Sequence, residues 1–335
     1  MLWQNCAKKT YPPPLKPLFR NSKILMIIKD FQKNVSLAKY TTFKIGGPAK
    51  YFYIAKTSKQ IINAVKLTQE LKISYFILGG GSNILISDRG FNGLAIKTES
   101  RKFKIIKNRI FAEAGAKLND LINASIKNNL SGLEWAVGIP GTLGGAINGN
   151  AGAFGEAISD SVEEVAILRK GKKIKLKNKE LKFGYRESLF KNNQDIILSA
   201  KLKLKKGERK KSKKIIKEYL EKRKAKQPLG FPSAGSIFKK ISLKEFDGKI
   251  KELIIKERPE FKEFAPAGWL IEKCGLKGKK IREARISEKH SNFIINLSGA
   301  KAEEVIILIS LIKQKIRNKF GVQLQEEIDY IGFDI

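Results

Sequence analysis

The stretch SGLEWAVGIPGTLGGAINGNAGAFG, residues 131–155, indicates how the chain is organised. Eight of its 25 residues are glycine and only Glu134 is charged, in a chain of 335 residues with a formal net charge of +35. Glycine inside an element costs stability, because it loses more backbone freedom on folding than other residues do. Such a run is typical of backbone that another molecule approaches closely, with N–H groups facing an anion. We interpret it as the floor of a phosphate or cofactor site; the alternative is a glycine-rich surface loop.

Length and composition predict a globular protein of about two domains. Hydrophobic residues make up 42% of the chain, which is enough for a sizeable core. Cys6 and Cys274 lie far apart and form no CxxC motif, so we predict neither a disulfide framework nor a metal site, and a reducing compartment. The apolar run at 24–28 is too short for a signal peptide or a membrane span. We therefore expect a cytoplasmic protein without a membrane span.

The positive charge would attract any polyanion, including nucleic acid and nucleotide ligands. The lysines, however, are spread over nearly every segment, and no zinc-finger, RNP or helix-turn-helix pattern accompanies them. A lysine-rich proteome is the interpretation we favour. We expect no specific nucleic-acid partner, although composition alone leaves such contact open.

A second glycine motif follows a predicted buried strand at 75–78. It reads Gly79-Gly80-Gly81-Ser82-Asn83 and runs into the apolar residues 84–86. A Rossmann loop would open a helix at this point and would have an acidic residue further on. Neither feature is present, so we reject a Rossmann domain. Backbone N–H groups, the Ser82 hydroxyl and the Asn83 amide could still bind a dinucleotide.

The remaining patterns predict an α+β protein. Thr57 and Gln60 form a capping box for a helix, a second helix spans 117–128, and a hairpin turns at Gly171. After a strand at 195–204 we place a domain boundary near 207. A basic amphipathic helix at 208–226 then leads to a mixed α/β layer, in which a helix at 301–320 is followed by a closing strand at 328–331.

Eight motifs, taken together and in order, resemble the UDP-N-acetylenolpyruvoylglucosamine reductase family, in its shorter architectural type. They are YTTFKIGGPA (40–49), LGGGSNILIS (78–87), the glycine-rich stretch 131–155, FGYRESLF (183–190), QPLGFPSAGSIFK (227–239), WLIEKCGLKG (269–278), ISEKHSNFIIN (286–296) and LQEEIDYIG (324–332).

The resemblance implies an N-terminal extension at 1–34, an FAD-binding domain of the vanillyl-alcohol-oxidase or PCMH type at 35–207, and a substrate-binding domain at 208–335. The charged segment 241–264 is an insertion in the last of these. The resemblance also implies FAD as cofactor, NADPH as hydride donor and a UDP-sugar as substrate. His290 is the only histidine and neither cysteine lies in the FAD region, so the flavin should be bound non-covalently.

The resemblance assigns residues to the cofactor and to the substrate. The implied substrate contacts are Tyr185 and Lys239; from the residues themselves, Arg223 is the candidate for a phosphate-facing contact on the basic helix at 208–226, whose cationic side is otherwise a solvated face. The cofactor contacts come from both glycine motifs: Gly79, Gly80, Gly81, Ser82, Asn83, Pro140, Gly141, Thr142, Gly145, Asn150, Ala151 and Gly152.

Three further residues are implied for catalysis. Reduction of an enolpyruvyl ether builds negative charge next to a carboxylate, and that charge needs stabilisation and then a proton. Arg186 suits the carboxylate, Glu327 suits the developing enolate if it is protonated, and Ser236 aligns with the family's proton donor. The adjacent Glu326 is the rival of Glu327; a proline is common in the family where Glu326 stands, so the register of the resemblance favours Glu327.

Two other functions stay open from the residues alone. One is a different FAD-dependent oxidoreductase of the same superfamily. The other is a basic nucleic-acid-binding protein on a degenerate flavoprotein scaffold, although the intact GGGSN, GYRES and PSAGS motifs argue against it.

Overall fold

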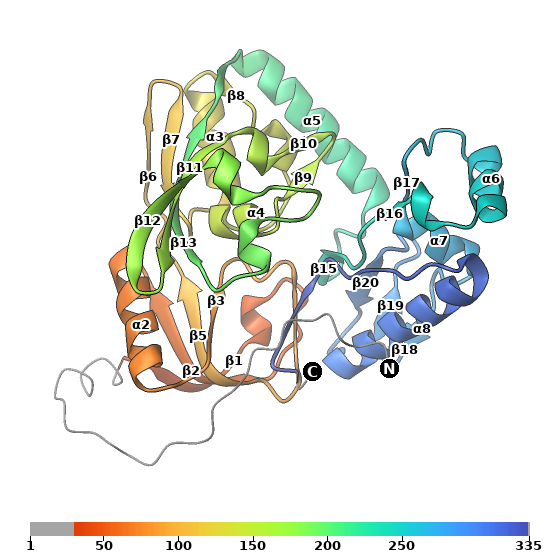
Figure 1. The fold of residues 1–335 in the computed structure, drawn as a ribbon, viewed down its shortest axis with the longest axis horizontal. Helices are drawn as coiled ribbons and strands as arrows, with labels where there is room; N and C mark the ends of the chain where they lie inside the picture. Colours follow the sequence, from red (N-terminus) through yellow and green to blue (C-terminus); the bar gives the residue numbers. More distant parts are fainter. Residues whose placement is uncertain (1–29, 334–335) are drawn as a thin grey trace.

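The structure is a computed structural model that describes residues 30–333. It has the α+β character predicted, with two lobes in the first part of the chain and a third body at the C-terminus (Figure 1). Most of the N-terminal extension predicted at 1–34 lies outside the described residues. Within 30–333, no helix has the length and apolar character needed to cross a membrane.

The first lobe is a four-stranded sheet in the order β1 (Gln32–Ser36), β2 (Pro48–Ala55), β5 (Phe91–Thr98) and β3 (Tyr75–Leu78). Strands β2, β5 and β3 are parallel and β1 is antiparallel to β2. Helix α2 (Ser58–Glu70) packs on the sheet, and the predicted cap is confirmed: Thr57 accepts a hydrogen bond from the N–H of Gln60 at 3.2 Å. The order of this sheet delivers the end of β3, and therefore the GGGSN loop, to the middle of the molecule.

The second lobe is an antiparallel sheet in the order β12 (Lys172–Lys177), β11 (Val162–Arg169), β13 (Ile196–Lys203), β7 (Arg109–Glu113) and β6 (Phe103–Ile106). The hairpin β11–β12 turns at Gly171 as predicted. The core between this sheet and its helices, α3 (Leu118–Lys127), α4 (Leu143–Asn148) and α5 (Arg209–Lys226), contains Trp135 and Leu143, both fully buried. The glycine-rich stretch 131–155 is therefore not a surface loop.

The third body is an antiparallel sheet in the order β15 (Ser233–Ser236), β20 (Phe293–Asn296), β19 (Ala284–Ile286) and β18 (Lys280–Ile281), packed with helices α7 (Ala267–Lys273) and α8 (Ala302–Phe320). The charged insertion is an excursion whose two ends pair as β16 (Ile241–Ser242) and β17 (Phe264–Ala265). Between them stand a single 3-10 turn and α6 (Gly248–Glu257), which project from the body in Figure 1.

Shorter elements complete the described chain. Two-stranded pairs join β8 (Leu130–Ser131) to β14 (Lys205–Lys206) and β9 (Gly152–Ala153) to β10 (Glu156–Ala157). Single 3-10 turns stand at Ala38–Tyr40, Glu134–Ala136, Ile158–Asp160, Asn178–Leu181, Leu189–Lys191 and Leu243–Glu245.

The expectation that 328–331 closes the C-terminal sheet is wrong. Strand β21 (Asp329–Ile331) leaves that body and pairs in parallel with β4 (Ile84–Ile86), directly after the GGGSN loop. In the described chain β4 has no other strand partner, and buried backbone polar groups need hydrogen bonds. The end of the chain therefore returns to the first lobe.

Helix α5 packs on the second lobe through Ile216 and Tyr219, although we assigned it to the C-terminal domain. A buried hydrogen bond from the Ser212 hydroxyl to Glu134 joins it to the glycine-rich stretch. The boundary at 207 stays a prediction, and this packing favours a division at the C-terminal end of α5.

Candidate active site

The two glycine motifs lie backbone against backbone. A Cβ atom placed on Gly80 would lie 2.6 Å from the Cα of Gly141, and one placed on Gly79 would lie 2.8 Å from the Thr142 Oγ1. Real Cβ atoms do not tolerate such distances, so glycine is required where the two segments meet. The loop after β3 and the entry to α4 thus form one continuous surface, as the prediction of a common site requires.

Alternate carbonyl groups of the GGGSN loop are held from outside the loop. The Gly79 carbonyl accepts a hydrogen bond from the Lys97 ammonium. The Gly81 carbonyl accepts one from the Thr42 N–H at 3.0 Å, and the Asn83 carbonyl accepts one from the Asp329 N–H at 2.9 Å. In a trans peptide the following N–H points opposite to the carbonyl, so these bonds turn the intervening N–H groups to the other side.

The loop contains a cradle, a row of unpaired N–H groups that is suited to an anion, and two of these groups, on Gly80 and Ser82, are turned by the bonds just described. Within residues 30–333, the backbone N–H groups of Gly80, Gly81, Ser82 and Asn83 donate to no protein acceptor. Unpaired N–H groups in a half-buried loop are rare in folded proteins, and a row of them is a binding site for phosphate oxygens. The cradle and the glycine contact surface fit the diphosphate of FAD.

Three predicted cofactor side chains are already engaged within the protein. The Asn150 amide donates to the Gly184 carbonyl at 2.8 Å, and the Asn83 amide donates to the Glu327 carbonyl at 2.9 Å. The Thr142 hydroxyl caps α4 by accepting from the Gly145 N–H at 3.3 Å. These hydrogen bonds hold the three side chains in place, and their roles as cofactor ligands stay predictions.

Arg186 and Glu327 form an ion pair at the junction of the lobes. The Arg186 Nε lies 2.6 Å from the Glu327 Oε1, and the Arg186 Nη2 donates to the Gly152 carbonyl at 2.8 Å. Arg186 has a φ of 55°, a left-handed conformation that is uncommon for a non-glycine residue and that clusters at functional sites. Burial raises the pKa of the Glu327 carboxyl and outweighs the opposing effect of the arginine.

A backbone hydrogen bond places the Ser236 strand next to the segment of Glu327. Ser236 ends β15, and the carbonyl of the next residue, Ile237, accepts the Glu327 N–H at 2.7 Å. Among the described residues, the Ser236 hydroxyl has no hydrogen-bond partner. The structure therefore brings the three predicted catalytic residues together from three distant segments, and it leaves this hydroxyl available.

Glu326 and Glu327 face different partners, which separates the two rivals. The Glu326 Oε1 accepts from the Lys313 ammonium on α8 at 2.9 Å, whereas Glu327 is paired with Arg186. Successive side chains of an extended segment point to opposite sides. Only Glu327 reaches the junction where Arg186 lies.

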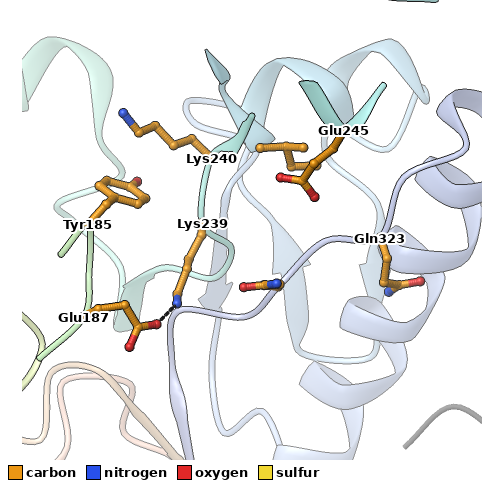
Figure 2. Close-up of a pocket in the computed structure, with 8 residues that line it drawn as sticks. Tyr185, Glu187, Lys239, Lys240, Glu245 and Gln323 are labelled. Atoms are coloured by element: carbon orange, nitrogen blue, oxygen red, sulfur yellow. Dashed lines mark hydrogen bonds and ion pairs between the residues drawn. The ribbon is translucent and has the colours of Figure 1, made fainter. Parts of the chain in front are cut away.

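A cavity of about 260 Å³ adjoins this junction, and Figure 2 shows its lining. Lys239 points toward Glu187, with which it forms an ion pair. The Lys240 Nζ lies 4.6 Å from the centre of the Tyr185 ring and 3.6 Å from that of Phe264. The full lining is Tyr185, Glu187, Lys239, Lys240, Ile241, Glu245, Gln323 and Gln325.

The sequence predicted Tyr185 and Lys239 but not the other residues of this cavity. The alternation of Gln323, Gln325 and Glu327 is a signal that could have identified two of them, because residues two apart share one face of an extended segment. Lys240, Ile241 and Glu245 belong to the insertion or its base, which none of the family motifs covers.

Arg223 is not among the residues that line the cavity. It is 8% exposed, its guanidinium lies 5.2 Å from the centre of the Phe154 ring, and its Nη2 donates to the Trp135 carbonyl at 3.4 Å. Its Nε is buried without a partner among the described residues, and burial lowers its pKa. The predicted contact of Arg223 with substrate stays a prediction.

Fold and site together define a flavoprotein. Residues 49–176 match a family model described as an FAD binding domain, and the cradle of the GGGSN loop lies within them. Residues 227–331 match a second model, described as the C-terminal domain of UDP-N-acetylenolpyruvoylglucosamine reductase.

Whole-chain comparisons give the particular family. The chain is 39% identical over 320 residues to the UDP-N-acetylenolpyruvoylglucosamine reductase of Caldanaerobacter subterraneus subsp. tengcongensis, covering 95% of this chain and 97% of that one. Against the enzyme of Caldicellulosiruptor bescii the identity is 41%, with coverages of 90% and 91%. The crystal structure of the enzyme from Thermus caldophilus superposes with a TM-score of 0.72 at 29% identity, covering 90% of this chain and 99% of that one. The chain belongs to the UDP-N-acetylenolpyruvoylglucosamine reductase family.

Proposed function

We propose that this chain reduces the enolpyruvyl ether of UDP-N-acetylenolpyruvoylglucosamine to the lactyl ether of UDP-N-acetylmuramate, with NADPH as reductant, in the cytoplasmic synthesis of peptidoglycan precursors. The observation that carries the proposal is the meeting of Arg186, Glu327 and the Ser236 strand beside the flavin cradle. When bound, FAD supplies the hydride that it receives from NADPH and that reduces the double bond.

Arg186 binds and orients the substrate carboxylate. Its Nε and Nη2 are engaged by Glu327 and Gly152, while its Nη1 has no partner among the described residues. A guanidinium is permanently charged and can hold a carboxylate oxygen in a fixed direction. It therefore stabilises the negative charge that develops on the carbon next to the carboxylate and spreads into it.

Glu327 acts as a hydrogen-bond donor in its protonated form. Burial raises the pKa of this carboxyl, which favours the neutral acid. A neutral carboxyl can accept from Arg186 through one oxygen and donate to the enolate oxygen through the other. That hydrogen bond strengthens as charge develops, which is the requirement for accelerating the step.

Ser236 supplies the proton that completes the product. The serine alkoxide left after proton transfer is a strong base, so the hydroxyl gives up its proton only to a base that is stronger still. The carbon of the enolate next to the carboxylate is such a base. The Ser236 hydroxyl has no protein partner among the described residues that would hold its proton elsewhere. The proton goes to the carbon next to the carboxylate, and water reprotonates the serine.

The cavity beside these residues suits the phosphorylated part of the substrate. Lys239 and Lys240 bring two cations to its wall, beside the carboxylates of Glu187 and Glu245. The Lys240 Nζ lies near the rings of both Tyr185 and Phe264. Burial lowers the pKa of Lys240 and outweighs the opposing effect of Glu263, and a diphosphate would offset the lowering by adding negative charge. We assign this cavity to the diphosphate, with Tyr185 and Lys239 in the roles predicted for them.

The test is substrate-dependent oxidation of NADPH by purified protein. We expect yellow protein that consumes NADPH only when UDP-N-acetylenolpyruvoylglucosamine is present and that releases UDP-N-acetylmuramate. Turnover of an unrelated alcohol with none of this sugar would overturn the proposal, and so would protein that purifies without flavin and cannot be reconstituted with FAD.

A further inference from the structure

Asn83 connects the cofactor loop to the segment that carries Glu327. Its side-chain amide donates to the Glu327 carbonyl at 2.9 Å, and its own carbonyl accepts the Asp329 N–H at 2.9 Å. The parallel pairing of β4 with β21 starts at once, with Asp329 opposite Ile84. One residue of the loop thus holds two positions on either side of residue 328, which lies 245 positions after it in the sequence.

The backbone of Glu327 is fixed at both of its polar groups. Its carbonyl accepts from Asn83, and its N–H donates to the Ile237 carbonyl at 2.7 Å. The first bond leads to the flavin loop and the second to the residue after Ser236. With both groups bound, the peptide planes beside Glu327 cannot rotate, and the carboxyl is directed at Arg186.

A nearby ion pair reinforces the same junction. The Lys191 ammonium lies 2.7 Å from one Asp329 carboxylate oxygen and donates to the other at 2.9 Å. Lys191 follows the segment that contains Arg186. Strand β21, directly after Glu327, is therefore bound to that segment through this ion pair and to the GGGSN loop through Asn83.

Asn83 presents different groups to the two sides. Its backbone N–H belongs to the unpaired cradle, whereas its side chain faces the acid segment. We infer that Asn83 is a positioning residue, which sets the place of Glu327 relative to the loop that binds the FAD diphosphate. The inference rests on the proposed role of Glu327.

The variants Asn83→Ala and Asn83→Asp test it, with Ser82→Ala as the comparison within the same loop. Alanine removes the amide donor, and aspartate keeps the shape but cannot donate to a carbonyl. The Ser82 side chain lies toward Gly141 rather than toward the acid segment. Because aspartate is nearly isosteric, it keeps the test usable if the alanine variant folds poorly.

Three readouts separate positioning from cofactor binding. In Asn83→Ala we expect the FAD affinity of the apoprotein, measured by flavin fluorescence, to change less than about threefold, because the backbone N–H is retained. The carboxylate of Asn83→Asp should lower this affinity by repelling the diphosphate, so that variant is compared by exchange and kinetics at saturating FAD. Hydrogen exchange of holoenzyme peptides covering 324–333 should accelerate about tenfold, the effect of leaving one buried carbonyl unpaired. Reoxidation of reduced enzyme by the substrate should slow about tenfold or more, with reduction by NADPH unchanged. Ser82→Ala should leave the exchange of 324–333 unchanged.

Two results would overturn the inference. In Asn83→Ala, a large loss of FAD affinity with unchanged exchange at 324–333 would make the Asn83 side chain a cofactor ligand, and unchanged exchange with unchanged kinetics would show that the anchor is not needed. Glu327→Gln, measured in parallel, tests the proposed function separately. If that variant reoxidises normally, the role of Glu327 fails, while hydrogen exchange at 324–333 still decides whether Asn83 holds the segment.

Discussion

Arg186 and Glu327 are 141 residues apart in the chain, yet the Nε of one lies 2.6 Å from the carboxyl oxygen of the other. Arginine at this site is more than a counter-ion, because its Nη2 also donates to Gly152 in the glycine-rich stretch. The pair therefore connects the cofactor side of the site to the C-terminal segment. We expect substitution of Arg186 and substitution of Glu327 to have different effects on the kinetics.

Glu327→Gln should change the pH dependence of the second stage, the reoxidation of reduced enzyme by the substrate. The pKa of Glu327 is raised, so the donating, protonated form persists to higher pH than for a free glutamate, and the rate should fall as pH rises through that pKa. Glutamine cannot ionise, so the variant should lose this fall and run about a hundredfold slower at low pH. Stopped-flow absorbance across a pH series measures it. A variant that keeps the wild-type profile would assign the titration to another group.

Arg186→Lys should slow the same stage about a hundredfold and raise KM for the sugar. An ammonium is a single point charge and cannot reach Glu327 and the Gly152 carbonyl while also holding a carboxylate in a plane. Arg169→Lys is the matched control, because Arg169 pairs with Asp195 at 2.6 Å without contact to the site residues. Steady-state kinetics of both variants provide the comparison, and equal effects would show that the Arg186 loss reflects general destabilisation.

Gly80→Ala should weaken FAD binding. The new Cβ would lie 2.6 Å from the Gly141 backbone, which cannot move aside as a flexible side chain could. Overpacking of this kind costs about 1–3 kcal/mol, which corresponds to roughly ten- to a hundredfold in affinity if the two walls separate. Gly248→Ala is the control, since a Cβ there meets nothing within 4 Å. Titration of both apoproteins with FAD checks the prediction, and equal affinities would contradict the contact between the two motifs.

Local signals predicted much of the fold. The cap at Thr57, the turn at Gly171 and the helix at 301–320 each depend on residues a few positions apart, and each is confirmed. The strand at 328–331 was also predicted as a strand, but with the wrong partner. Alternating apolar residues indicate which face of a strand is buried but not which strand it pairs with. The pairing of β21 with β4 could therefore not be predicted from the sequence.

The site shows the same division. Family motifs identified Arg186, Ser236 and Glu327, which the structure brings together. The interactions of the residues around these three depend on contacts between segments that are distant in the sequence. The hydrogen bond from the Asn83 amide to the Glu327 carbonyl and the placement of Lys240 against Phe264 leave no periodic pattern in the sequence, because each is a single contact between two separate segments.

The most direct test of the proposed chemistry is to follow the two stages separately in Ser236→Ala. The proton is needed only after the double bond has received its hydride, so reduction of the bound flavin by NADPH should proceed at the wild-type rate. Reoxidation by UDP-N-acetylenolpyruvoylglucosamine should slow by roughly 10²–10⁴-fold, the usual contribution of a positioned proton donor. Anaerobic stopped-flow absorbance of the flavin measures both rates on the same protein. Unequal slowing, confined to the second stage, is the predicted result; equal slowing of both stages, or none in either, would contradict it.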